Sequence, residues 1–138
     1  MYDRNHAQQH WLESLIAKLG GIAGTVHVRS GPDELTLAAA VHIPEPVKQI
    51  VQRIPRGKGM AGLALERDEA ISTCNLQTDA SGQVRPGARA VDAKAAVALP
   101  VHDDRRQVRA VVGVAFQDDK QLTDAELAAL AQAAASLP

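Results

Sequence analysis

Aromatic residues are almost missing from this chain of 138 residues, which has one Trp, one Tyr and one Phe. Proteins that bind single-stranded nucleic acids stack the bases on aromatic side chains, and this chain lacks such platforms. Its formal net charge of −1 also leaves no basic excess to neutralise a phosphate backbone. We therefore expect no nucleic-acid partner and a core built from aliphatic side chains.

Cysteine and long apolar runs are equally scarce. Cys74 is the only cysteine, which excludes an internal disulfide and a cysteine-based zinc cluster. No apolar run approaches the length of a membrane span, and the polar first residues do not resemble a signal peptide. We expect one cytoplasmic domain over residues 1–138, with no membrane partner.

The hydrophobic pattern predicts helices and strands in alternation. Helices are expected at 7–19, within 44–54, at 60–66 and from the capping box at Thr123 to Leu137, and strands at 22–29, 34–43, 70–74, 94–102 and 108–116. The last two strands are apolar on both faces, so we expect them to be central and covered on both sides. The predicted fold class is α+β: a mostly antiparallel sheet with the terminal helices on one face, and a middle helix plus a lid loop at 75–90 on the other.

Local motifs carry a family resemblance. They are the turn Gly57-Lys58-Gly59-Met60-Ala61-Gly62, the strand Ala96-Val97-Ala98-Leu99-Pro100-Val101, the strand Val111-Val112-Gly113-Val114 and the helix start Leu122-Thr123-Asp124-Ala125-Glu126. In this order and spacing the chain resembles the GAF domain, a small-ligand sensing module related to PAS domains. The G-x-G-x-x-G turn also fits a dinucleotide-binding fingerprint, which requires a buried parallel strand before it. A proline and a predicted short helix precede it instead, so we reject that interpretation.

The resemblance bears on enzyme activity through Cys74. A few GAF proteins are free methionine-(R)-sulfoxide reductases, and this chain has a similar Ile-Pro-x-Gly-Lys-Gly loop. Their chemistry uses more than one cysteine, one of them within the glycine turn, where this chain has Ala61. Because a lone thiol cannot resolve its sulfenic acid as an internal disulfide, we expect no enzyme. Motifs for a cyclic nucleotide or a bilin are not matched either, so the sequence identifies no cofactor.

Small residues on the even-numbered face of the central strands predict a ligand pocket beneath the lid. The expected lining residues are Gly24, Met60, Leu63, Cys74, Leu76, Ala96, Ala98 and Phe116. Arg85 and Arg89 on the lid, with the helix N-terminus at the glycine turn, favour a ligand that has an anionic head and an apolar body. Two other interpretations stay open: alanine-rich helices that pack closely without a pocket, and lid arginines that pair with Asp79 or Asp92 in solvent.

Three functional hypotheses follow. The first is a small-ligand sensor that passes a conformational change to a signalling partner, the second is a dimerisation or interaction module, and the third is a redox enzyme using Cys74. The two amphipathic terminal helices predict a homodimer interface, and the polar 78–90 segment predicts fast amide exchange without ligand. His27, His42 and His102 are interpreted as ordinary strand residues. His6 and His10 share a helix face but have no convincing third ligand, so no metal site is predicted.

Overall fold

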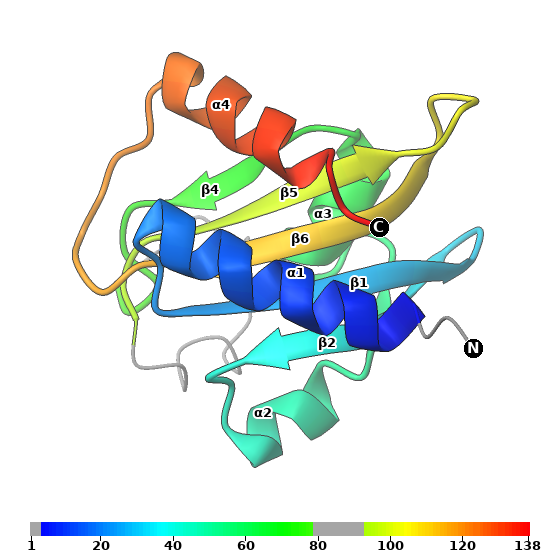
Figure 1. Ribbon diagram of the computed structural model, residues 1–138, viewed down its shortest axis with the longest axis horizontal. Coiled ribbons are helices and arrows are strands. Elements are labelled where there is room, and N and C mark those ends of the chain that lie inside the picture. The colour runs from blue at the N-terminus through cyan, green and yellow to red at the C-terminus, as the bar shows by residue number, and fades with distance from the viewer. Residues whose placement is uncertain (1–3, 79–92) are drawn as a thin grey trace.

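The computed structural model describes residues 4–78 and 93–138 (Figure 1). The helices are α1 (Arg4–Leu19), α2 (Glu45–Ile50), α3 (Gly59–Arg67) and α4 (Asp124–Ala134). The strands are β1 (Ala23–Gly31), β2 (Glu34–Val41), β3 (Arg53–Pro55), β4 (Ile71–Thr73), β5 (Ala96–His102) and β6 (Val108–Ala115). In this part of the chain, no helix is long and apolar enough to cross a membrane.

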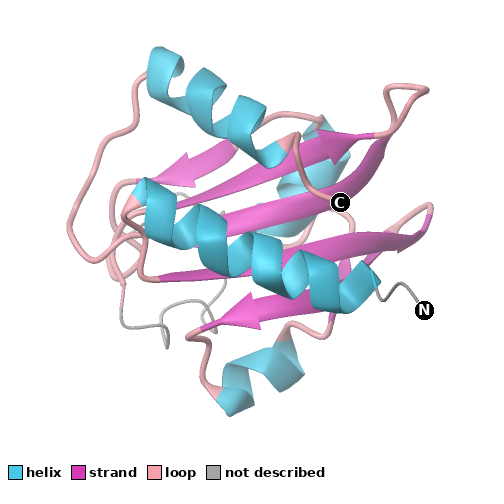
Figure 2. Ribbon diagram, in the orientation of Figure 1, coloured by secondary structure: helices cyan, strands magenta, loops and turns pink. Residues whose placement is uncertain are grey.

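The strands form one six-stranded sheet in the order β3-β2-β1-β6-β5-β4, and every neighbouring pair is antiparallel. Helices cover both faces of it: α1 and α4 lie on one face and α3 lies on the other (Figures 1 and 2). The predicted α+β class, the antiparallel sheet and the two-sided arrangement of helices are confirmed. Neither β5 nor β6 is an edge strand, as their apolar faces predicted.

One short helix or turn was expected in the 44–54 segment, but the structure has a helix followed by a strand. Helix α2 ends at Ile50, and the chain then adds β3 to the edge of the sheet, where Ile54 pairs with Leu35 of β2. Pro55 is compatible with this strand because only one side of an edge strand needs its backbone N–H groups for pairing. This strand precedes the glycine turn, but it is a short antiparallel edge strand rather than the buried parallel strand of a dinucleotide fold.

A large aliphatic core lies between the sheet and the terminal helices. Leu12 of α1, Val26 of β1 and Leu99 of β5 are fully buried there, and Leu130 of α4 joins them. The start of α4 is fixed by the predicted capping box: the Thr123 hydroxyl accepts from the Glu126 N–H, and the Glu126 carboxylate accepts from the Thr123 N–H. The terminal helices therefore pack on the sheet as the apolar stripes predicted.

Strand register decides which side chains face α3. Ala96 pairs with Ala115 and Ala98 pairs with Gly113, so even-numbered residues of β5 share a face with odd-numbered residues of β6. Thr25 of β1 is also opposite Gly113 and lies on this same face. Small side chains from neighbouring strands are thus collected under α3.

The glycine turn sets the position of the α3 N-terminus. Gly57 and Gly59 have φ angles of +83° and +67°, which residues other than glycine rarely adopt. Gly62 packs against the turn itself, because a Cβ atom there would lie 2.5 Å from the Pro55 carbonyl oxygen. The Gly57 N–H donates to the Gly62 carbonyl across this contact at 2.8 Å. These glycines build a tight strand-to-helix connection that directs the start of α3 over the sheet.

The close packing at Gly62 gives a test of this connection. Gly62→Ala is expected to destabilise the protein by about 1–3 kcal/mol, because the Pro55 carbonyl is backbone and has to shift. Gly31→Ala is the matched control, since a Cβ atom there has no neighbour within 4 Å. Urea unfolding of both variants measures the difference; equal stabilities would contradict the packing described.

Candidate ligand pocket

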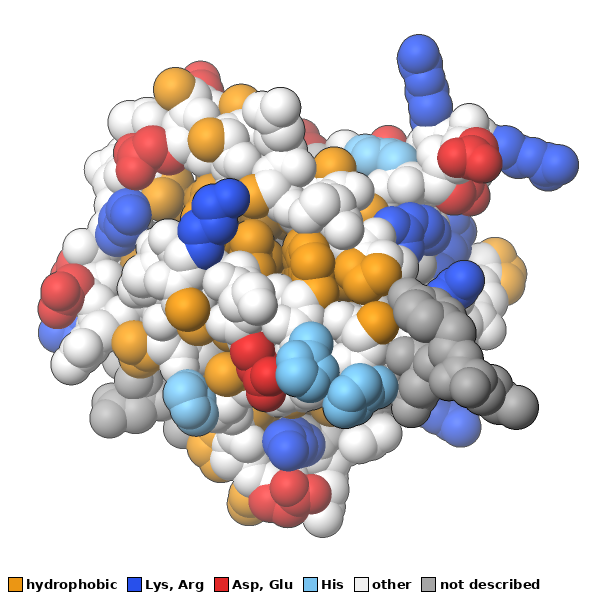
Figure 3. All heavy atoms as spheres, in the orientation of Figure 1, with side chains coloured by type: hydrophobic (Ala, Val, Ile, Leu, Met, Phe, Trp, Pro, Cys, Tyr) orange, Lys and Arg blue, Asp and Glu red, His pale blue; other side chains and the backbone are white. Residues whose placement is uncertain are grey.

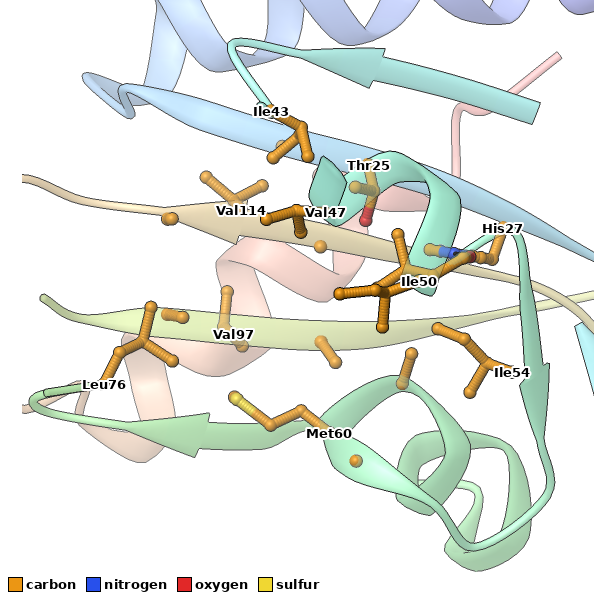
Figure 4. Close-up of a pocket in the computed structure, with 18 of the residues that line it drawn as sticks. Thr25, His27, Ile43, Val47, Ile50, Ile54, Met60, Leu76, Val97 and Val114 are labelled. Atoms are coloured by element: carbon orange, nitrogen blue, oxygen red, sulfur yellow. Dashed lines mark hydrogen bonds between the residues drawn. The ribbon is translucent and has the colours of Figure 1, made fainter. Parts of the chain in front are cut away.

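A cavity of about 170 Å³ lies between α2, the N-terminus of α3 and the sheet (Figure 4). Its walls are mostly apolar. Elements far apart in the sequence meet there, since β1, β5 and β6 form its floor and the segments around α2 and α3 form its roof. Concave apolar sites with a few polar groups are the usual form of a small-molecule site.

The floor is wide because its side chains are small. Ala96 and Ala98 of β5 face the cavity next to Gly113 of β6. A Cβ atom at Gly113 would approach the Thr25 hydroxyl to 2.9 Å, which places Gly113 on the pocket face. Sequence reasoning missed Gly113, whose hydrophobic-hydrophobic-Gly-Val context was used only to identify the strand.

The roof is made of larger and more flexible side chains. Val47 and Ile50 come from α2, Met60 comes from the start of α3, and Leu76 follows β4 (Figure 4). Val47 and Leu76 are buried, whereas Ile50 is 54% exposed. Ile50 thus lines the cavity with about half of its surface in solvent, because Val47 is the one buried residue of the six-residue α2.

Polar groups enter the cavity from the glycine turn. Lys58, Gly59 and Ala61 line it at the start of α3. Lys58 is the N-cap residue and makes no side-chain capping bond. The first N–H groups of a helix lack partners within the helix, and they carry a partial positive charge. This end of the pocket is suited to a hydrogen-bond acceptor or an anion.

His27 is the polar side chain that reaches from floor to roof. It is 2% exposed, and its Nε2 lies 2.8 Å from the Val51 carbonyl oxygen at the end of α2. Because a carbonyl only accepts, Nε2 carries the proton in this hydrogen bond. Burial lowers the pKa of the ring below its ordinary value, and the bond to Val51 opposes this only in part. The neutral ring thus ties β1 to α2.

Several predicted lining residues do meet at this cavity. Met60, Leu76, Ala96 and Ala98 line it through their side chains or their position on its floor, and Gly24 lies beside them. Gly24 contributes backbone only, because a Cβ atom there would lie 2.7 Å from Ile16 Cδ1 of α1, on the opposite face. The prediction that the missing side chain of Gly24 creates pocket volume is therefore wrong.

Three other predicted residues lie elsewhere. Leu63 packs in a separate cluster under α3, Cys74 is exposed, and Phe116 belongs to the core beneath the terminal helices. Phe116 lies on the face of Val112 and Val114, because the register puts the odd-numbered residues of β6 on the pocket face. Arg85 and Arg89 lie outside the described residues, and so does the 79–92 part of the expected lid. Their roles stay predictions.

The fold defines a class of protein, an antiparallel sheet covered by helices on both faces with an apolar cavity between the sheet and α2 and α3. A family model for the GAF domain matches residues 3–137. The chain therefore belongs to the GAF domain family, a family of sensory and signalling modules. No curated protein matches its sequence.

Three similar solved structures have sequence identities below 20% and therefore show the fold alone. The free methionine-R-sulfoxide reductase of Neisseria meningitidis in complex with its substrate has a TM-score of 0.76 and 16% identity, over 96% of this chain and 74% of that one. A domain of a sensor histidine kinase protein from Sinorhizobium meliloti has a TM-score of 0.75 and 12% identity, over 99% and 89%. The nlh2 GAF domain of A. aeolicus in an inactive state has a TM-score of 0.68 and 18% identity, over 98% and 80%.

The burial of His27 predicts a pH dependence of stability. Its pKa is lowered from 6.5 in the folded protein, so below that pH the unfolded chain binds a proton that the folded ring does not. The free energy of unfolding therefore falls as the pH drops below about 6.5, by at most about 1.4 kcal/mol per pH unit, until the folded ring is protonated as well.

Substitution isolates this component of the pH dependence. His27→Gln keeps an N–H donor for the Val51 carbonyl but removes the titrating group, so it is expected to flatten the slope. His10→Gln, at an exposed position of α1, is the control and is expected to leave the slope unchanged. Urea unfolding between about pH 7.5 and pH 5 measures the slopes; the same slope in wild type and His27→Gln would show that His27 does not titrate as described.

Proposed function

We propose that this domain is a sensor that binds a small molecule with an apolar body and an anionic head, and passes the resulting change to a signalling partner. The observation that carries the proposal is the apolar cavity of about 170 Å³ beside the uncapped N-terminus of α3. An engineered cavity of about 150 Å³ lined by aliphatic side chains is large enough to bind benzene. A single ring or a branched aliphatic group therefore fits this cavity.

The anionic head is supported by the groups at one end of the cavity. The α3 N–H groups and the Lys58 side chain both favour negative charge there. The only other ionisable side chain on the described walls is His27, which is neutral. In the described residues, no carboxylate lines this pocket. An acid bound with its apolar part over Ala98 and its head toward Lys58 is matched to both surfaces.

A sensor is favoured over a reductase for this chain. The reductase of Neisseria meningitidis shares the fold, and its structure holds its substrate. Here the single thiol, Cys74, is exposed and is not among the residues that line the cavity. A thiol oxidised to sulfenic acid needs a second thiol to form a disulfide, and the sequence has one cysteine.

The strands of the floor offer a route for the signal. Thr25 faces the pocket while its neighbour Val26 is buried against the core under α1, and Ala98 and Leu99 alternate in the same way. A molecule that displaces the floor therefore moves side chains beneath the terminal helices. Figure 3 shows the face formed by those helices, where apolar side chains are visible between charged ones. We place a homodimer interface on α1 and α4, whose outward positions include the exposed residues Ala17, Ala125, Ala128 and Ala129.

Native mass spectrometry of the purified protein, compared before and after denaturation, tests ligand binding. Wild type is expected to release an additional mass on denaturation, detected as an acid in negative-ion mode. Ala98→Leu fills the floor of the cavity and is expected to abolish this mass. Ala135→Leu adds the same side chain at an exposed position of the C-terminal segment and is expected to keep it. No released mass from wild type, or equal retention by Ala98→Leu, would refute the proposal.

The dimer is tested separately by sedimentation velocity. Wild type is expected to sediment as a dimer, and Ala128→Arg is expected to shift it toward monomer, because a charge at the centre of an interface is desolvated on association. Gln107→Arg, on the exposed β5–β6 turn, is the control for added charge and is expected to stay dimeric. A wild-type monomer at high micromolar concentration would exclude this interface.

A further inference from the structure

Helix α2 forms the least anchored wall of the pocket. It has six residues and no side-chain N-cap, and isolated helices of this length are unstable in water. Val47 is its one buried residue. Among residues 4–78 and 93–138, the side-chain hydrogen bond that joins the 44–51 segment to the rest of the protein is the one from His27 Nε2 to the Val51 carbonyl. The next link along the chain is the backbone bond from the Leu37 N–H to the Gln52 carbonyl, at 2.8 Å.

Both links lie at the C-terminal end of α2. The Lys48–Glu45 ion pair is within the helix and is exposed, so it does not hold α2 to the sheet. The chain just before α2 is held as well, since His42 Nδ1 lies 2.9 Å from the Ile22 carbonyl oxygen. The helix is thus held on both sides, while its body meets the floor through Val47. The helix can therefore move toward the floor between these two anchors without breaking a sheet hydrogen bond.

Ile50 marks the direction of that movement. Of the large hydrophobic side chains in the described residues it is the exposed one, with 54% of its surface in solvent, and it lines the mouth of the cavity (Figure 4). An isoleucine left in water gains free energy from any apolar surface that covers it. The walls of the cavity leave about half of this side chain uncovered, and an apolar molecule bound beside it supplies that surface.

We propose that α2 closes over an apolar ligand and that the half-exposed Ile50 side chain, which already borders the cavity, is buried against the bound molecule. This inference rests on the proposed function, because it requires a ligand in the cavity. It assigns Ile50 as a ligand-contacting residue and α2 as the element that changes on binding. Closure also moves the segment that connects β2 to β3, so the conformational change on binding reaches that edge of the sheet.

Toluene is the probe, since a single ring fits a cavity of this size. The wild-type protein is labelled at its isoleucine and valine methyl groups, and a neutral gadolinium chelate reports their exposure by paramagnetic relaxation. Saturating toluene is expected to shift the Val47 methyl resonances and to reduce the relaxation of the Ile50 methyl groups several-fold. The resonances of Val101, buried on the opposite face of β5, provide the internal reference.

Affinity gives a second, independent readout. Ile50→Ser is expected to weaken toluene binding about tenfold, since about half of an isoleucine side chain is no longer buried on closure. Gln49→Ser is the matched control, because it changes the helix propensity of α2 at an exposed position that does not line the cavity, and it is expected to bind as wild type does.

The outcomes separate the two proposals. Shifted Val47 resonances with unchanged Ile50 relaxation, or equal affinities for Ile50→Ser and Gln49→Ser, would overturn the closure while leaving the pocket in place. Unshifted pocket resonances at saturating toluene would overturn the binding of an apolar molecule and the closure with it. If both variants lose affinity equally, helix stability rather than Ile50 contact controls binding, and the assignment of Ile50 is wrong.

Discussion

Two antiparallel pairs of small residues determine whether this domain has a pocket. Ala98 is opposite Gly113 and Ala96 is opposite Ala115, and all four lie on the face beneath α3. A one-residue slip between β5 and β6 would bring larger side chains such as Val112 to this face and fill the space. The cavity, the position of the α3 N-terminus over it and the contact with α2 all depend on this register.

The polar groups of the pocket have separate roles because they lie on different elements. Lys58 and the first residues of α3 line one end of the cavity, whereas His27 uses its one donor to hold the Val51 carbonyl. Burial keeps the His27 ring neutral, so positive charge is concentrated at the α3 end. This separation underlies the proposed ligand, with its anionic head at the α3 end and its apolar body in the middle.

Much of the fold could be predicted from sequence because its signals are local. The capping box at Thr123, the glycine turn and the apolar alternation of β5 and β6 each depend on a few neighbouring residues. The pocket was predicted only in part. Ala96 and Ala98 were identified by their size. Gly24 was assigned to the wrong face because even-numbered residues of neighbouring strands share a face only where the register allows it. Phe116 was also assigned to the pocket, and it lies in the core on the other face. His27 gave no signal, since its burial depends on Val51, 24 residues away.

A crystal structure of the protein as purified, without added ligand, tests the central claim most directly. The account predicts electron density for a small molecule between Ala98 and α2, with its polar end toward the first N–H groups of α3. Density for Ile50 packed against that molecule would agree with a closed α2. A cavity filled by the side chains of Met60 and Ile50, with no space left above Gly113, would contradict the claim that this domain binds a small molecule there.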